Sequence, residues 1–127
     1  MATLPPYAET LGLSIEHGDD VAPVLLMPFG TLVLGRPGFL HGGAISGLLE
    51  MAAIVALQHA LGAEAARIKP VNVTVDFMRG GREKETRAVG IVTRLGTRVA
   101  NVEAVAWQDE RGKPIAAARM NFLIERG

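Results

Sequence analysis

The stretch GFLHGGAISGLLEMAAIVAL, residues 38–57, decides the fold. We predict a helix over residues 42–61, stopped by Gly62, because apolar residues occupy nearly every face of a helix with this sequence. A helix that is apolar all round must be enclosed by other parts of the structure. Glu50 is its only acidic residue, and burial of an unpaired carboxylate is costly. The helix therefore needs an enclosing layer, and Glu50 needs a role or a partner.

Four segments after the helix have the character of β-strands. In the first, apolar residues at positions 71, 73, 75 and 77 alternate with Asn72, Thr74, Asp76 and Met78, which is typical of a sheet with one buried face. The predicted strands cover residues 71–79, 86–95, 98–108 and 114–125. Before the helix, we predict helical turns at residues 7–12, a strand, a turn at 18–20 and a second strand within 13–29, and a loop at 30–40.

These strands predict one sheet. Successive strands joined by short glycine-bearing turns are expected to pair antiparallel. The fold class is then α+β, a single domain over residues 1–127 with one long central helix wrapped by a five- to six-stranded antiparallel sheet. One sheet cannot cover a helix that is apolar on all sides, so we expect a second subunit to complete the enclosure.

Composition excludes several classes of protein. The 127 residues are 49% hydrophobic and 20% charged, which favours a globular domain over a disordered chain. Thirteen Lys and Arg balance thirteen Asp and Glu, so no net charge attracts nucleic acid or an anionic membrane. The chain has no cysteine. It begins without a basic segment followed by an apolar run, so we expect no secretory signal and a cytoplasmic protein. The longest apolar stretch, residues 42–57, is too short for a bilayer span and contains Glu50, so we expect no membrane span.

The few histidines and serines predict neither a metal site nor a serine nucleophile. His41 and His59 are 18 residues apart, about 27 Å along a helix, and cannot share an ion. His17 is the third histidine. The two serines, Ser14 and Ser46, lie outside any GxSxG motif.

The start of the helix, His41-Gly42-Gly43, is the strongest candidate site. The N–H groups of a first helical turn are unpaired and carry the positive end of the helix dipole, and glycines let a ligand oxygen approach them. Such an arrangement can act as an oxyanion hole. Two structural alternatives remain open: the glycines serve only tight packing, or Glu50 pairs with an arginine across a subunit contact.

The spacing of Gly43 and Glu50 constrains any joint action. They are seven residues apart, about 10.5 Å along one helix, so a single carbonyl cannot touch both. If both act on one substrate, the carboxylate must come from a neighbouring subunit whose helix runs antiparallel. A dimer then contains two equivalent composite sites.

At this point the residues resemble a known family. The stretch quoted above resembles the HGG-helix motif of the PaaI-like hot-dog-fold acyl-CoA thioesterases, and VNVTVDFMRGG (71–81) and GTRVANVEAVAWQDERGKPIAAARMNFL (96–123) resemble its following strands. The resemblance spans about residues 35–123. It implies a helix wrapped in a curved sheet, a homodimer or homotetramer, and hydrolysis of an acyl- or aryl-acyl-CoA thioester, with no cofactor beyond the coenzyme A of the substrate.

The resemblance also implies roles for individual residues. The oxyanion glycine of the family falls on Gly43, with Gly42 beside it, and the catalytic carboxylate falls on Glu50 as general base or nucleophile. The histidine falls on His41, which organises the loop. Contacts to the coenzyme A nucleotide are implied around Arg79 and Gly80 and around Arg98 and Val99, and Phe39 and Leu40 are expected to line the acyl pocket.

The chain departs from the family at two positions. Many members have an Asn where this chain has Gly35, and a hydroxyl residue where it has Pro70. Asn72 or Ser46 is a candidate to take over the polar role. These departures keep open a second function, a non-catalytic acyl-CoA binding module. The GRPG sequence upstream of Glu50 suggests a third, a hydroxyacyl-thioester dehydratase, but this chain lacks the histidine that such an enzyme usually has in the loop before the helix.

Overall fold

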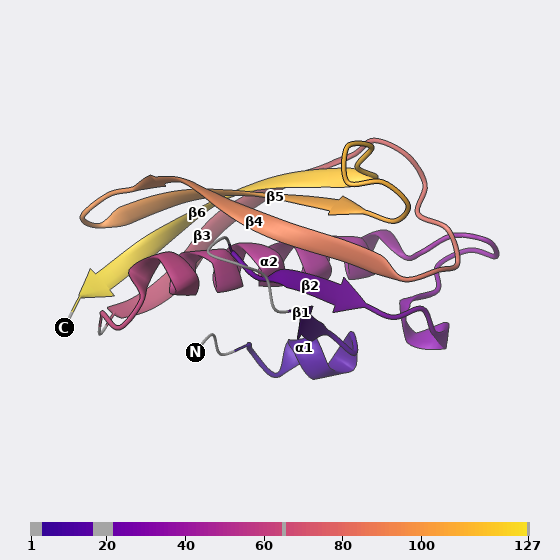
Figure 1. Ribbon diagram of the computed structural model, residues 1–127, viewed down its shortest axis with the longest axis horizontal. Helices are drawn as coiled ribbons and strands as arrows, with labels where there is room; N and C mark the ends of the chain where they lie inside the picture. Colours follow the sequence, from indigo (N-terminus) through magenta and orange to yellow (C-terminus); the bar gives the residue numbers. More distant parts are fainter. Residues whose placement is uncertain (1–3, 17–21, 65, 127) are drawn as a thin grey trace.

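The computed structural model describes residues 4–16, 22–64 and 66–126. One long helix lies against a six-stranded antiparallel sheet (Figure 1). The elements are α1 (Tyr7–Thr10), β1 (Ser14–Glu16), β2 (Val24–Met27), the 3-10 helix η1 (Thr31–Val33), α2 (Gly42–Leu61), β3 (Ala66–Phe77), β4 (Thr86–Leu95), β5 (Val99–Trp107) and β6 (Ala116–Arg126). The predicted fold class is confirmed, and the turn predicted at residues 18–20 lies outside the described residues.

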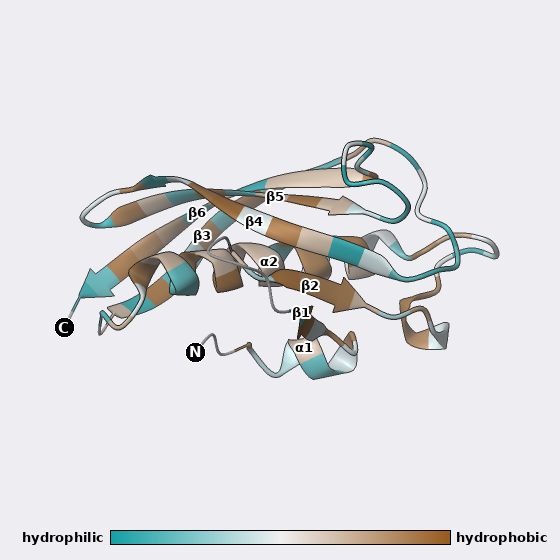
Figure 2. Ribbon diagram, in the orientation of Figure 1, coloured by the Kyte–Doolittle hydropathy of each residue, from teal (hydrophilic) through white to brown (hydrophobic). Residues whose placement is uncertain are grey.

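The central helix α2 has the predicted bounds. It begins after the cap residue His41 and ends at Gly62, whose positive φ of 61° stops it while its N–H donates to the Gln58 carbonyl. By length and composition α2 meets the criteria for a membrane span, but most of it is buried within the protein. It is therefore the core helix of the protein. Figure 2 shows hydrophobic residues on both the helix and the strands of the sheet.

Alanine and glycine on the sheet let α2 approach closely. The inner-face residues Ala88, Ala104 and Ala118 are at most 3% exposed. An ideal Cβ placed on Gly90 of β4 would lie 2.5 Å from the Ala52 carbonyl oxygen of α2. Because that oxygen is backbone, only glycine fits at position 90 without moving the helix.

The strand order corrects one sequence prediction. The order is β1-β2-β4-β5-β6-β3, and every pairing is antiparallel. The consecutive strands β3 and β4 do not pair, so residues 78–85 form a crossover between distant strands rather than a hairpin turn. The Leu40 N–H donates to the Gly81 carbonyl at 2.9 Å, which fixes this crossover beside the start of α2.

Strand β3 forms one edge of the sheet. Val73, Val75 and Phe77 are opposite Met120, Ala118 and Ala116 of β6, so the predicted apolar face does lie on the core side. In the single chain, however, Val73 is 37% exposed and Phe77 is 55% exposed. The expectation of a buried face is thus wrong for the isolated chain, because an edge strand has a neighbour on one side only.

The opposite edge is short and held by an ion pair. Arg87 of β4 reaches across β2 to Glu16 of β1, with Nε 2.8 Å from Oε1. Hydrogen bonding to Glu16 raises the pKa of the Arg87 guanidinium. Both side chains are partly exposed, so the pair contributes only about 0.2–1 kcal/mol.

Candidate active site at the start of the central helix

The two glycines that begin α2 differ in their amides, because one amide is occupied and the other is free. The Gly43 N–H donates to Nδ1 of His41 at 2.9 Å, so the amide predicted to hold a carbonyl already has a partner. The preceding amide, Gly42 N–H, makes no hydrogen bond within the part of the chain that the structure describes. It is the first orphan donor of the helix, at the positive end of its dipole.

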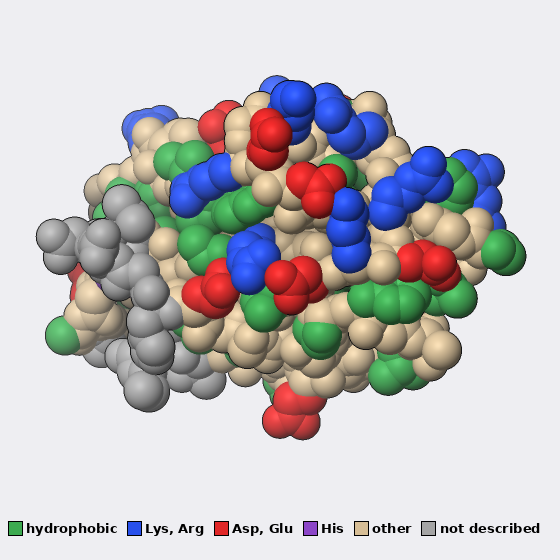
Figure 3. Space-filling view, turned by 45° about the vertical axis from the view of Figure 1, so that its right-hand side comes forward, with side chains coloured by type: hydrophobic (Ala, Val, Ile, Leu, Met, Phe, Trp, Pro, Cys, Tyr) green, Lys and Arg blue, Asp and Glu red, His purple; other side chains and the backbone are tan. Residues whose placement is uncertain are grey.

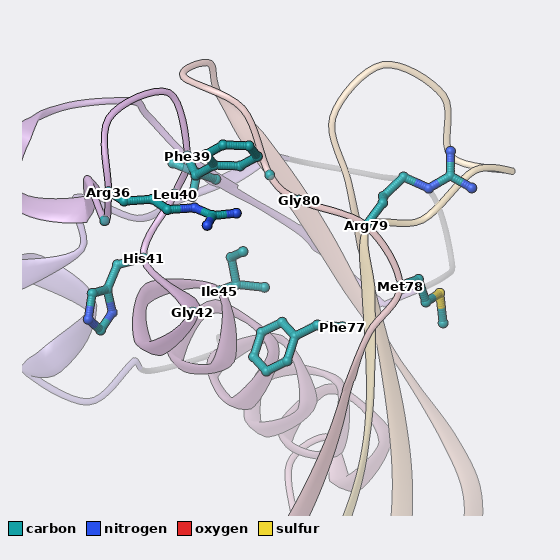
Figure 4. Close-up of a pocket in the computed structure, with 12 residues that line it drawn as sticks. Arg36, Phe39, Leu40, His41, Gly42, Ile45, Phe77, Met78, Arg79 and Gly80 are labelled. Carbon is teal, nitrogen blue, oxygen red and sulfur yellow. The ribbon is translucent and has the colours of Figure 1, made fainter.

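A hollow of about 510 Å³ opens at this end of the helix. Three segments form it: the loop before α2, the first turn of α2, and the chain from the end of β3 into the crossover (Figure 4). Its lining is apolar with arginine at the margin, and among the described residues it includes no acidic side chain. The lining residues are Gly35, Arg36, Phe39, Leu40, His41, Gly42, Ile45, Phe77, Met78, Arg79, Gly80 and Gly81.

Most of the predicted loop residues meet in this pocket. Phe39, Leu40, His41, Gly42, Arg79 and Gly80 all line it, whereas Gly43 does not. In Figure 4 the Arg79 side chain points away from the pocket, so the residue contributes its backbone here. The Arg79 side chain is available to a second hollow, of about 260 Å³, that it also lines.

Glu50 lies halfway along α2 and outside the pocket lining. The structure corrects the expectation that it is buried: it is half-buried. Its carboxylate has neither an ion pair nor a hydrogen bond among the described residues. One chain alone therefore does not bring this acid to the start of its own helix.

Arg98 and Val99 lie at the far end of the molecule. They belong to the β4–β5 hairpin, at the end opposite the crossover (Figure 1). The Arg98 carbonyl accepts a hydrogen bond from the Ile124 N–H at 2.7 Å. Within a single chain these two residues do not join the pocket.

The polar substitutes proposed for the missing Asn and hydroxyl are not in the pocket lining. Asn72 instead ends a ladder of amides across β5, β6 and β3. Asn101 Nδ2 donates to Asn121 Oδ1, and Asn121 Nδ2 donates to Asn72 Oδ1 at 2.9 Å. The structure also explains why residue 35 is a glycine, since a Cβ there would lie 3.0 Å from the His41 Cα.

Sequence reasoning missed three pocket-side residues. Phe77 was assigned only a packing role, yet its ring lines the pocket beside Gly42. Arg36 was not considered, and Arg82 was one of several cations suited to the coenzyme A phosphates but was passed over for Arg79 and Arg98; both guanidinium groups stack on the Phe39 ring. The Arg-Pro-Gly-Phe sequence at residues 36–39 was the available signal, because Pro and Gly at the centre of a turn bring its first and fourth residues together.

The described residues contain no cluster of three or more His, Cys, Asp or Glu side chains arranged to hold a metal ion. His17 lies outside that part of the chain.

A long helix held in an antiparallel sheet, with a pocket at the helix start, defines a protein of the hot-dog fold. Residues 37–115 match the sequence model of the thioesterase superfamily. The chain belongs to this superfamily and is a thioester hydrolase. The resemblance noted from the sequence is thereby confirmed.

Individual relatives are similar over nearly the whole chain. A medium/long-chain acyl-CoA thioesterase, YigI of Salmonella typhimurium, is 26% identical over 94% of this chain and 85% of its own length. A phenylacetic acid degradation-related protein of Ralstonia eutropha is 25% identical, with a TM-score of 0.79, over 96% of this chain and 92% of that one. AziG of S. sahachiroi shares the fold, with a TM-score of 0.86 at 22% identity, over 98% of this chain and 100% of that one.

Proposed function

We propose that the protein hydrolyses acyl-CoA thioesters at a site completed by a second copy of the chain. The observation that carries the proposal is the free Gly42 amide at the pocket, together with a half-buried Glu50 that has no partner in the described part of its own chain. The similarity to YigI, named as a medium/long-chain acyl-CoA thioesterase, supports coenzyme A as the thiol carrier.

The Gly42 amide is the donor that we assign to the thioester carbonyl. Its N–H has no partner among the described residues and belongs to a residue that lines the pocket, whereas the Gly43 N–H is held by His41. A carbonyl oxygen that becomes negative in the transition state is stabilised there by the amide and the helix dipole. His41 then has a positioning role, because its imidazole holds the Gly43 amide and fixes the first turn.

The partner's Glu50 supplies the carboxylate in this mechanism. As a general base it removes a proton from water, the resulting hydroxide attacks the thioester carbon, and the C–S bond breaks; the protonated carboxyl returns its proton to the departing thiolate, which releases the acid and the coenzyme A thiol. As a nucleophile it attacks the carbon directly, the C–S bond breaks as the coenzyme A thiolate leaves, and water then hydrolyses the mixed anhydride to release the acid and regenerate the carboxylate. Both routes need the partner's carboxylate beside the thioester, and the base route also needs room for a water between the carboxylate and the carbon.

The free β3 edge is the surface that we assign to the dimer. Val71, Val73 and Phe77 give this edge an apolar character, and no strand in the described part of the chain pairs with its outer backbone groups. Two copies pairing these edges about a two-fold axis run antiparallel. Such a dimer brings the middle of one α2 towards the start of the other, as the composite site requires.

Thiol release from a panel of thioesters tests the proposal. We expect hydrolysis of medium-chain or aryl-acyl-CoA, measured with phenylacetyl, benzoyl, octanoyl and dodecanoyl substrates. Coenzyme A binding without thiol release from any of them would contradict the proposed activity and favour a binding module.

A further inference from the structure

Two arginines share one aromatic ring at the mouth of the pocket. The Cζ atom of Arg36 lies 4.4 Å from the centre of the Phe39 ring, and that of Arg82 lies 4.5 Å from the same point. The two guanidinium groups are therefore at most about 9 Å apart. Figure 3 shows several Lys and Arg side chains over the upper and right-hand parts of the face that it draws, with acidic side chains among them.

A tight turn holds Arg36 and Phe39 in place. The Phe39 N–H donates to the Arg36 carbonyl at 3.0 Å, and Gly38 has a φ of 88°. Pro37 followed by a left-handed glycine is the pattern of a type II turn, which places its first and fourth residues side by side. The ring also lies against Gly80, where an added Cβ would be 2.7 Å from Phe39 Cε1.

A side-chain amide holds Arg82 from the other direction. Gln108, just after β5, accepts the Arg82 N–H at 2.9 Å and donates to the Arg82 carbonyl at 3.0 Å. Both backbone groups of Arg82 are thus bonded to one side chain. The two arginines are positioned by separate parts of the fold, so their convergence on Phe39 is built into the structure.

The charges around the two arginines leave them free for an anion. Arg36 lines the larger hollow and Arg82 lines the second. The two hollows are adjacent, since Arg79 and Gly80 line both of them. The acids of the second hollow, Asp109 and Glu110, pair with lysines: Lys84 at 2.7 Å and Lys113 at 3.8 Å. Neither Arg36 nor Arg82 has an ion pair among the described residues.

We propose that Arg36 and Arg82, sharing the Phe39 ring, bind the phosphate ester of a 4′-phosphopantetheine arm whose thioester lies at Gly42. The proposal rests on the proposed thioesterase function and deepens it. Guanidinium groups match phosphate oxygens through paired N–H donors, and Arg36 lines the same hollow as Gly42. The same phosphate occurs in coenzyme A and on an acyl carrier protein.

We call Arg36 and Arg82 the arginine clamp, and matched variants test it. Arg36→Gln and Arg82→Gln remove one guanidinium each, and Arg111→Gln is the control, because Arg111 also stacks on an aromatic ring, 5.0 Å from the Trp107 centre, but lines neither hollow. Calorimetry with coenzyme A, 4′-phosphopantetheine and pantetheine gives a readout independent of turnover, and the last two ligands differ only in the phosphate. We expect each clamp variant to bind coenzyme A and 4′-phosphopantetheine at least tenfold more weakly and pantetheine within twofold of wild type.

Kinetics with one acyl group on three carriers identifies the source of the phosphate. The wild type should have a larger kcat/KM for acyl-CoA, or for acylated carrier protein, than for acyl-pantetheine. In each clamp variant this ratio of kcat/KM values should fall at least tenfold, because KM for the phosphorylated substrate rises. The carrier with the larger wild-type kcat/KM is the source.

An unchanged preference, or equal losses for phosphorylated and unphosphorylated ligands, would overturn the clamp. If the wild type releases thiol while the clamp variants bind coenzyme A normally, the clamp fails and the thioesterase function stands. If the wild type hydrolyses none of the three thioesters, the thioesterase function fails, and coenzyme A binding still decides the clamp.

Discussion

The imidazole of His41 accepts the backbone N–H of Gly43, with 2.9 Å between Nδ1 and N. This contact gives the conspicuous histidine a positioning role at the helix start. It also occupies the Gly43 amide, so the oxyanion donor that we propose is the neighbouring Gly42 amide, whose N–H is unpaired among the described residues. The roles of the two adjacent glycines can therefore be separated by substitution.

Gly42→Pro should abolish turnover in a folded protein. Proline removes the N–H at the first helical position, where it is well tolerated, and the extended backbone of His41 (ψ 132°) suits a residue before proline. We expect kcat to fall about 10²- to 10³-fold, the cost of losing one oxyanion donor. Steady-state kinetics and circular dichroism measure the two effects.

Two alanine variants serve as controls for the proline. Gly42→Ala keeps the N–H, and its Cβ would lie an ordinary 3.5 Å from Phe77 Cζ, so it should lose far less activity than the proline variant. Gly43→Ala puts a Cβ 2.9 Å from the His41 ring and displaces the cap, which should cost about 1 kcal/mol of stability. A Gly42→Pro enzyme with normal kcat would exclude this amide from the mechanism.

Glu50→Gln should reduce turnover at least about 100-fold while the fold is retained. The side chain has no intrachain partner among the described residues, so the substitution breaks no contact within the chain, and the loss reports its chemical role. Glu83→Gln, on the exposed crossover, is the control. Near-normal kcat in Glu50→Gln would remove this carboxylate from the reaction.

Gly90→Ala should destabilise the fold by about 1–3 kcal/mol, because the added methyl group meets the Ala52 carbonyl oxygen of the core helix. Urea unfolding measures the change. Gly112→Ala has open space around its Cβ and no positive φ, so it should be neutral. Equal midpoints for the two variants would mean that α2 packs less closely on β4 than described here.

Val73→Lys should give a folded monomer with little activity. Val73 lies on the apolar side of the free β3 edge and is already partly exposed in the chain, so the charge is tolerated in the monomer and costly in a dimer interface. Analytical ultracentrifugation gives the mass. Ile91→Lys, at an exposed position on β4 that β5 and β6 separate from β3, should leave the dimer intact, and a dimeric Val73→Lys protein would place the interface elsewhere.

The pattern of apolar residues along the chain predicted the bounds of several elements. The errors concern which strands pair, which involves residues far apart in the sequence. The bounds of α2 and β4 follow from apolar periodicity and flanking glycines, which are properties of neighbouring residues. The position of β3 beside β6 does not, because the glycine-bearing segment after β3 looks like a hairpin turn although it is a crossover. Which strands pair depends on closure of the whole sheet, and periodicity carries no information about that.

The candidate site was likewise only partly predictable. The clustering of Phe39, His41 and Gly42 follows from their proximity in sequence. The convergence of Arg36 and Arg82 on one ring does not, since it depends on the crossover lying beside the loop before α2. Whether the Gly42 or the Gly43 amide is left free depends on the rotamer of the His41 imidazole, which the sequence alone does not determine.

A hybrid dimer tests the central claim most directly. When one subunit carries Gly42→Pro and the other Glu50→Gln, one of the two sites combines an intact Gly42 amide with an intact partner carboxylate, and the other site carries both defects. Hybrids isolated through two different affinity tags should therefore recover about half of the wild-type kcat per dimer. A hybrid as inactive as the two parent variants would contradict a site shared between subunits.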